Sequence, residues 1–176
     1  ISQSHQQNEL VRLLAQRMNA HAVFIYAPCY PVTNRDRELY MQTDAMRRLQ
    51  EYWSALTVAV LGIGSPSRLA QTVPQSYLYT GNDSPSDERP SAVGDICVRL
   101  VDIDGKVCSS SNSDKVVGVP LSQLKKVPSV IAAAGGEEKA ASILGALRTG
   151  VIDILVSDTL TMRRVLELNE ETKSFR

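Results

Sequence analysis

The stretch that decides the fold is residues 130–144, which read V-I-A-A-A-G-G-E-E-K-A-A-S-I-L. It opens with a short apolar run, which is typical of a strand buried on both faces. Gly135 and Gly136 then allow a sharp turn and a close approach of the backbone to a ligand. Glu137 and Glu138 follow in the first turn of a helix, where negative charge suits the helix dipole. The stretch therefore predicts a strand, a glycine turn and a helix.

Lys139 lies at the start of that helix, near the carboxyl end of the strand. In open α/β sheets, ligands bind at the carboxyl ends of the strands. We therefore consider Lys139 a candidate cation for a small-molecule site. A solvated lysine in an ordinary strand–turn–helix connection is the plainer alternative, and spacing alone favours it, because isolated glycine motifs are weak signals.

The rest of the chain repeats the alternation of strand and helix. Further apolar runs predict buried strands over residues 21–27, 56–61, 96–102 and 151–156. Helical periodicity and capping residues predict helices over residues 7–18, 35–54, 137–148 and 157–168, the second with a break near Thr43. Turn chemistry at residues 102–105 predicts a hairpin. The order predicts one α/β domain over residues 1–176, with a mostly parallel sheet flanked by helices on both faces.

Two other turns carry polar groups. The apolar run 56–61 leads into Gly62-Ile63-Gly64-Ser65, whose backbone N–H groups and hydroxyl could hold an anion or sugar hydroxyls. A turn needed only to reverse the chain is equally compatible with these residues. Asp95 follows a glycine at the start of a strand, where it could accept hydrogen bonds from ligand hydroxyls or simply cap its own turn.

The composition and net charge of the chain argue against several classes of protein. Nineteen basic and nineteen acidic residues give zero net charge, which argues against a nucleic-acid surface built on bulk charge. The three cysteines lack metal-ligand spacing, so we expect reduced thiols in a cytoplasmic protein, with neither a metal nor a cofactor. No apolar run is long enough to span a membrane, and no signal peptide is visible.

Signatures of catalysis are also missing. The chain has no G-x-S-x-G, P-loop or G-x-G-x-x-G motif, and only two histidines. No pair of carboxylates is placed by sequence as a general acid and base. The polar groups expected at strand ends therefore suit holding a polar ligand better than transforming it.

Five motifs occur in one order and together carry a family resemblance. They are G-I-G-S at 62–65, V-G-D-I-C at 93–97, D-K-V-V-G at 114–118, A-G-G-E-E-K-A at 134–140 and I-D-I-L-V-S-D ending at Asp158. In this order they resemble the C-terminal effector-sensing domain of SorC-type bacterial transcriptional regulators, over about residues 8–168.

The resemblance implies a fold similar to ribose-phosphate isomerase and glucosamine-phosphate deaminase, used as a sensor without catalysis. A sugar or sugar phosphate would bind and alter DNA affinity and homo-oligomerisation. Lys139 matches the lysine of the family's G-G-x-x-K turn. Asp95 matches an acidic residue that contacts the ligand. Gln6 matches a polar residue that precedes the first helix. Gly62, Gly64 and Ser65 match the strand-end turn that faces the ligand. Arg68 is the nearest candidate for a phosphate-binding arginine.

The resemblance further implies that the DNA-binding domain and the first part of the sensor domain lie upstream of Ile1. Operator DNA would then be bound only through that upstream part, and the ligand site in this chain would lack one wall. A sugar-phosphate isomerase or deaminase on the same fold is the alternative function, and a purely structural oligomerisation module is a third.

Overall fold

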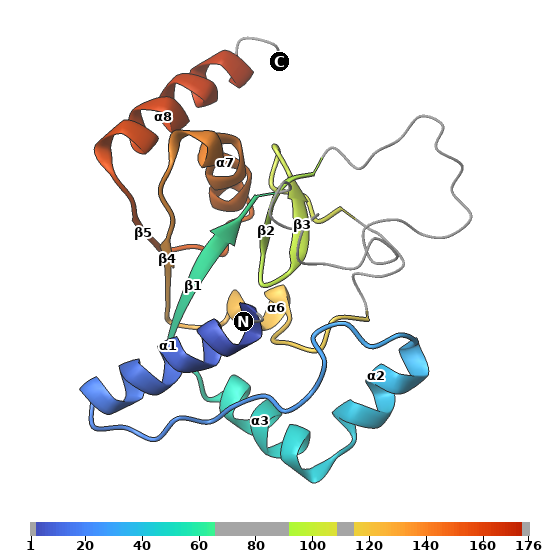
Figure 1. Cartoon of the computed structure of the whole chain (residues 1–176). Helices are drawn as coiled ribbons and strands as arrows, with labels where there is room; N and C mark the ends of the chain where they lie inside the picture. The colour runs from blue at the N-terminus through green and yellow to red at the C-terminus, as the bar shows by residue number, and fades with distance from the viewer. Residues whose placement is uncertain (1–2, 66–91, 109–114, 174–176) are drawn as a thin grey trace.

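The computed structural model describes residues 3–65, 92–108 and 115–173, which form a five-stranded sheet with helices packed around it (Figure 1). The strand order is β3-β2-β1-β4-β5. The strands are β1 (Val58–Gly64), β2 (Ala92–Ile96), β3 (Arg99–Asp102), β4 (Ser129–Ala133) and β5 (Ile154–Val156). The expected α/β class is confirmed.

The sheet is mixed. β1 runs parallel to β4, and β4 runs parallel to β5, whereas β1–β2 and β2–β3 are antiparallel. The parallel part is the expected one, built from strands that alternate with helices. The antiparallel part contains more than the single hairpin we expected, because β2 pairs with β1 as well as with β3.

The helices are α1 (Gln3–Arg17), α2 (Asn34–Met41), α3 (Asp44–Ser54), α6 (Leu121–Leu124), the short 3₁₀ helix η2 (Glu137–Lys139), α7 (Ala140–Arg148) and α8 (Thr159–Lys173). The expected break at Thr43 is confirmed, since its hydroxyl accepts a hydrogen bond from the Met46 amide at 3.3 Å and caps α3. Gly150 follows α7 with φ 66°, the left-handed geometry expected after a helix end.

Residues 21–27 do not form the buried strand that their apolar, β-branched sequence predicts. They run without regular secondary structure, and the side chains of Val23 and Tyr26 are 51% and 84% exposed. A strand needs a partner for its backbone groups as well as a suitable sequence. In the described ranges this segment is not part of any sheet, so the prediction is wrong.

The antiparallel segment contains one turn more than predicted. The turn at residues 102–105 is confirmed, because the Asp102 carboxylate accepts hydrogen bonds from the amides of Asp104 and Lys106 at 2.9 and 2.8 Å. The strand predicted over residues 96–102 is interrupted, however, by a two-residue turn at Cys97 and Val98 between β2 and β3.

The core lies between the sheet and α7. Ile63 and Ile96 on the sheet pack with Ile143 on α7 and Val165 on α8. The helix lies almost flush on β2, since a Cβ atom at Gly94 would fall 2.7 Å from the Cβ atom of Ser142. The Ser142 hydroxyl then donates to the carbonyl oxygen of Val93 at 2.6 Å.

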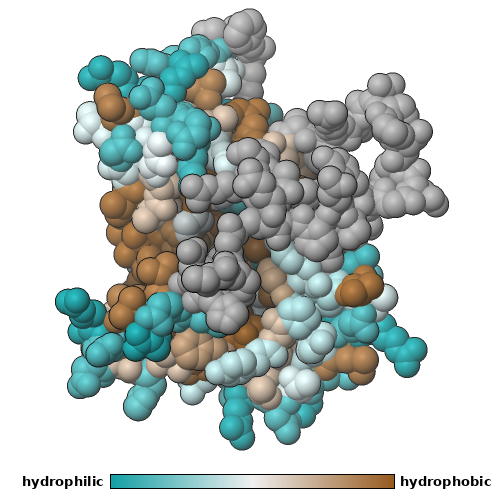
Figure 2. All heavy atoms as spheres, in the orientation of Figure 1, coloured by the Kyte–Doolittle hydropathy of each residue, from teal (hydrophilic) through white to brown (hydrophobic). Residues whose placement is uncertain are grey.

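The opposite face of the parallel strands is open. Val58 and Val60 on β1 and Ile154 and Val156 on β5 have side chains that are 48–66% exposed. Figure 2 shows hydrophobic atoms gathered where Figure 1 places these strands. The expectation that each strand is covered on both faces therefore does not hold at these positions in the described part of the chain.

Candidate functional site

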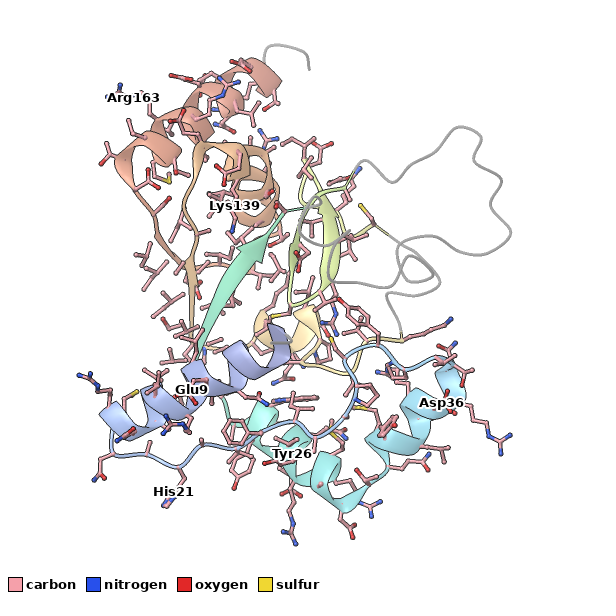
Figure 3. All side chains as sticks on the ribbon, viewed as in Figure 1. Glu9, His21, Tyr26, Asp36, Lys139 and Arg163 are labelled. Atoms are coloured by element: carbon pink, nitrogen blue, oxygen red, sulfur yellow. The ribbon has the colours of Figure 1, made fainter. Side chains whose placement is uncertain are left out.

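Lys139 reaches across from η2 to the carboxyl end of β1. Its ammonium donates a hydrogen bond to the carbonyl oxygen of Ile63 at 3.0 Å. Figure 3 shows Lys139 beside the end of the β1 arrow. The glycine turn and the G-I-G-S turn, which are far apart in the sequence, are thus joined by one side chain.

Asp95 lies against the same end of β1. It is the antiparallel partner of Gly64, and a Cβ atom at Gly64 would collide with its carboxylate. Gly64 is therefore required by the position of the Asp95 side chain. Asp95 itself is only 9% exposed.

The carboxylate of Asp95 is held in a poorly solvated position. Burial raises its pKa, and the Val98 amide and the positive charge of Lys139 oppose this by lowering it. The Val98 N–H donates to the carboxylate at 3.0 Å. The plainer alternative for Asp95, capping its own turn, is therefore confirmed. Asp95 also lies beside Gly64 and near the positive charge of Lys139.

The turn capped by Asp95 is strained. Cys97 and Val98 have φ angles of 47° and 69°, a pair of positive values that defines the tight hairpin geometry normally reserved for Asn-Gly. Positive φ is unusual for a β-branched residue. Sequence analysis missed this turn because neither residue is a turn former, and the carboxylate three residues before Val98 was the available signal.

The glycine turn at Gly135 and Gly136 is held in place by hydrogen bonds to the start of α8. The Gly136 amide donates to the Thr161 hydroxyl at 2.8 Å, and that hydroxyl donates to the Asp158 carboxylate at 2.6 Å. The hydrogen bonds from Thr161 lower the pKa of Asp158. A Cβ atom at Gly135 would lie 2.8 Å from Asp158 Oδ2. The turn is thus held by internal bonds, and its contribution to the site is to position Lys139.

The structure brings together Gly64, Asp95 and Lys139, with Ser65 directly after Gly64 and mostly buried. Gly62 lies two residues earlier, opposite Ala133 of β4. Gln6 was expected just before the first helix, but it belongs to α1, which begins at Gln3. Its side chain and the whole of Arg68 lie outside what the structure describes.

Two further groups at this edge were missed. The carbonyl oxygen of Ile63 anchors Lys139, and a main-chain acceptor leaves no signature in a sequence. Ser157 follows β5, and within the described ranges its buried hydroxyl has no hydrogen-bond partner. Buried polar atoms are seldom left in this way, so Ser157 is a polar group available at the carboxyl edge of the sheet.

These features define an α/β ligand-binding domain, with polar groups at the carboxyl edge of its parallel strands. Residues 1–167 match the family model described as "Putative sugar-binding domain". The chain belongs to this family, the sugar-binding domain of SorC-type transcriptional regulators.

Named relatives are transcriptional regulators. The sorbitol operon regulator of Klebsiella pneumoniae is 30% identical over 160 residues, which are 91% of this chain and 50% of that protein. The crystal structure of full-length SorC from that organism matches with a TM-score of 0.78 over 90% of this chain and 51% of that one, at 30% identity. The deoxyribonucleoside regulator of Bacillus subtilis is 28% identical over 90% of this chain and 50% of its own length. The chain therefore spans about half the length of these relatives.

Two features are absent from the described residues. No helix there is long and apolar enough to cross a membrane. The same residues contain no group of three or more histidine, cysteine or acidic side chains placed to hold a metal ion.

Proposed function

We propose that this chain is the effector-sensing domain of a bacterial sugar-responsive transcriptional regulator. It binds a sugar or sugar phosphate at the carboxyl end of β1, between Lys139 and Asp95. The full-length protein acts in the cytoplasm, binds operator DNA through a separate domain, and changes its DNA affinity and its homo-oligomeric state when the ligand binds.

The observation that carries the proposal is the convergence of Lys139, Asp95 and the backbone of β1 at one point. An ammonium supplies donors only, and a carboxylate supplies acceptors, so the pair matches the mixed donors and acceptors of sugar hydroxyls. Asp95 is buried, so a hydrogen bond from a ligand hydroxyl to its carboxylate would be stronger than the same bond in water. The unpartnered hydroxyl of Ser157 adds a polar group at the same edge of the sheet.

The family supports a sensor rather than an enzyme, since its named relatives are regulators. Gln6, Gly62 and Ser65 are included in the proposed site by resemblance. Gly62 leaves space beside β1, where a Cβ atom would meet only the Ala133 carbonyl oxygen at 3.9 Å. No cofactor is needed, because binding requires only the side chains and backbone groups already named.

The test is a ligand screen on the intact protein, by thermal shift, with ribose 5-phosphate, glucosamine 6-phosphate, sorbitol 6-phosphate and their unphosphorylated sugars. We expect saturable stabilisation by at least one sugar or sugar phosphate, and the same compound recovered unchanged after incubation. Conversion of the bound compound into an isomer or a deaminated product would instead establish an enzyme. Stable oligomers indifferent to every compound would establish a structural module.

A further inference from the structure

Away from Lys139, two arginine side chains donate hydrogen bonds to the backbone of the segment 116–118. Arg99 begins β3, directly after the strained turn, and its guanidinium donates to the carbonyl oxygens of Cys97 at 2.9 Å and Gly118 at 3.4 Å. Arg37 comes from α2 and donates to the carbonyl oxygen of Val116 at 3.3 Å. Both side chains are partly buried.

The two guanidinium groups are close enough to repel each other. Their acceptors on Val116 and Gly118 are two residues apart, a span of at most about 7 Å in an extended chain. Burial lowers the pKa of Arg99, and the positive charge of Arg37 lowers it further. The segment thus holds two like charges whose acceptors are two residues apart, in partly buried positions.

Among the described residues, no acid forms an ion pair with either guanidinium. The six ion pairs within the described residues involve five other cations and six acids, and none of them includes Arg37 or Arg99. By contrast, Arg148 is similarly buried but lies 3.9 Å from the Asp104 carboxylate. Burying a charge without a counter-ion costs free energy, and two adjacent charges cost more. An anion between the two guanidinium groups would remove both costs.

We propose that Arg37 and Arg99 form a phosphate-binding subsite, which takes a phosphate monoester or free orthophosphate. The planar guanidinium presents paired N–H donors that match phosphate oxygens, and two such groups can hold one phosphate from two sides. Backbone carbonyls fix each guanidinium at one or two of its five N–H groups and leave other donors for the anion.

This subsite is distinct from the Lys139 site. Arg99 is the cross-strand partner of Ile96, a core residue, whereas Asp95 pairs with Leu100. Because neighbouring positions on a strand point to opposite faces, Arg99 and Asp95 leave the hairpin on opposite sides. The inference goes beyond the sugar site and does not depend on it.

The experiment is a titration of the intact protein with orthophosphate at constant ionic strength, followed by calorimetry and by thermal shift, with chloride as the reference anion. We expect saturable binding in the native protein, and at least tenfold weaker binding in both Arg99→Gln and Arg37→Gln. Arg35→Gln is the matched control, since Arg35 is an exposed arginine in the same helix, and its titration should equal that of the native protein. Arg99→Lys keeps the charge but not the planar fork, so its affinity should be intermediate.

A phosphate monoester distinguishes the two sources of the anion. Glycerol phosphate, without a sugar ring, should bind as orthophosphate does if the subsite reads only the phosphate group, and more tightly if it also contacts the ester. Absence of saturable binding by both compounds overturns the subsite, as does binding that survives in Arg37→Gln, a variant on the surface of α2 that is expected to fold normally. Neither orthophosphate nor glycerol phosphate is a sugar, so failure here leaves the proposed sugar site untouched.

Discussion

The ammonium of Lys139 lies 3.0 Å from the carbonyl oxygen of Ile63, a contact between residues 76 positions apart. It joins the turn after β4 to the end of β1, and it sets the lysine beside the buried Asp95 carboxylate. An ammonium has three donors, and this bond uses one of them. The same contact therefore fixes the side chain and leaves it able to bind a ligand.

Gly64→Ala should destabilise the protein by about 1–3 kcal/mol, because the new Cβ atom would displace the buried Asp95 carboxylate from its place. Chemical denaturation measures the free energy of unfolding. Gly62→Ala is the matched control, since the nearest atom to its Cβ would be 3.9 Å away. If the collision is the cause, Asp95→Ala should recover much of the loss in the double variant. Strict additivity of the two changes would contradict this explanation.

Asp95→Asn should flatten the pH dependence of stability. Because burial raises the folded-state pKa of Asp95, the folded protein keeps this proton to a higher pH than the unfolded chain does. Asp95 therefore favours folding below the ordinary carboxylate pKa, about 4, and this contribution is lost as the pH rises through the raised value. The asparagine oxygen can still accept the Val98 amide, so the turn should persist. Unfolding curves between pH 3.5 and 7 test this, and equal slopes for the two proteins would count against a raised pKa.

Val98→Gly should raise the free energy of unfolding by about 1 kcal/mol, since a residue with a Cβ atom pays to adopt the left-handed geometry. Val98→Ala keeps the Cβ atom and serves as the control, so it should bring no gain. Equal effects of the two substitutions would show that the side chain of Val98, rather than its backbone angle, determines the result.

Thr161→Val should cost about 1–3 kcal/mol, because it removes the 2.8 Å acceptor of the Gly136 amide and leaves only the longer 3.4 Å contact with Asp158 Oδ2. It should also lower the affinity for a ligand at Lys139, because the position of Lys139 depends on this turn. Thr159→Val, at the exposed start of α8, is the control. Denaturation and ligand titration of both variants separate the two effects. A Thr161→Val protein as stable as the control would exclude the anchoring role of the hydroxyl.

The sequence was most informative where local chemistry decides the structure. The strand, glycine turn and helix over residues 130–144 and the helix break at Thr43 depend on short-range preferences, and both were predicted. α8 extends beyond the predicted end because Arg148 donates to Asn169 and Thr172 at 2.8 Å each, which stabilises the last turn from a distant element. The sequence offers no signal for such a contact.

The wrong predictions also concern structure that depends on distant parts of the chain. Residues 21–27 have strand-forming side chains but no strand beside them, and pairing is decided by the whole fold. The turn at Cys97 and Val98 forms without turn-forming residues because Asp95 and the pairing of β2 with β3 impose it. For the site, Lys139 was expected just after a strand and lies there, whereas Asp95 was expected at the start of a strand and lies inside β2. The anchor on Ile63 was not predicted, since it is a backbone atom.

Lys139 is the residue that we propose binds a sugar or sugar phosphate. The most direct measurement is the thermal shift of the intact protein with the best compound from the screen, compared between the native protein, Lys139→Ala and Lys126→Ala, an exposed lysine as the control. Stabilisation follows RT ln(1 + [L]/Kd), so a lost contact appears as a lost shift. We predict the full shift in the native protein and in Lys126→Ala, and no shift in a folded Lys139→Ala protein. A full shift in Lys139→Ala would contradict the account.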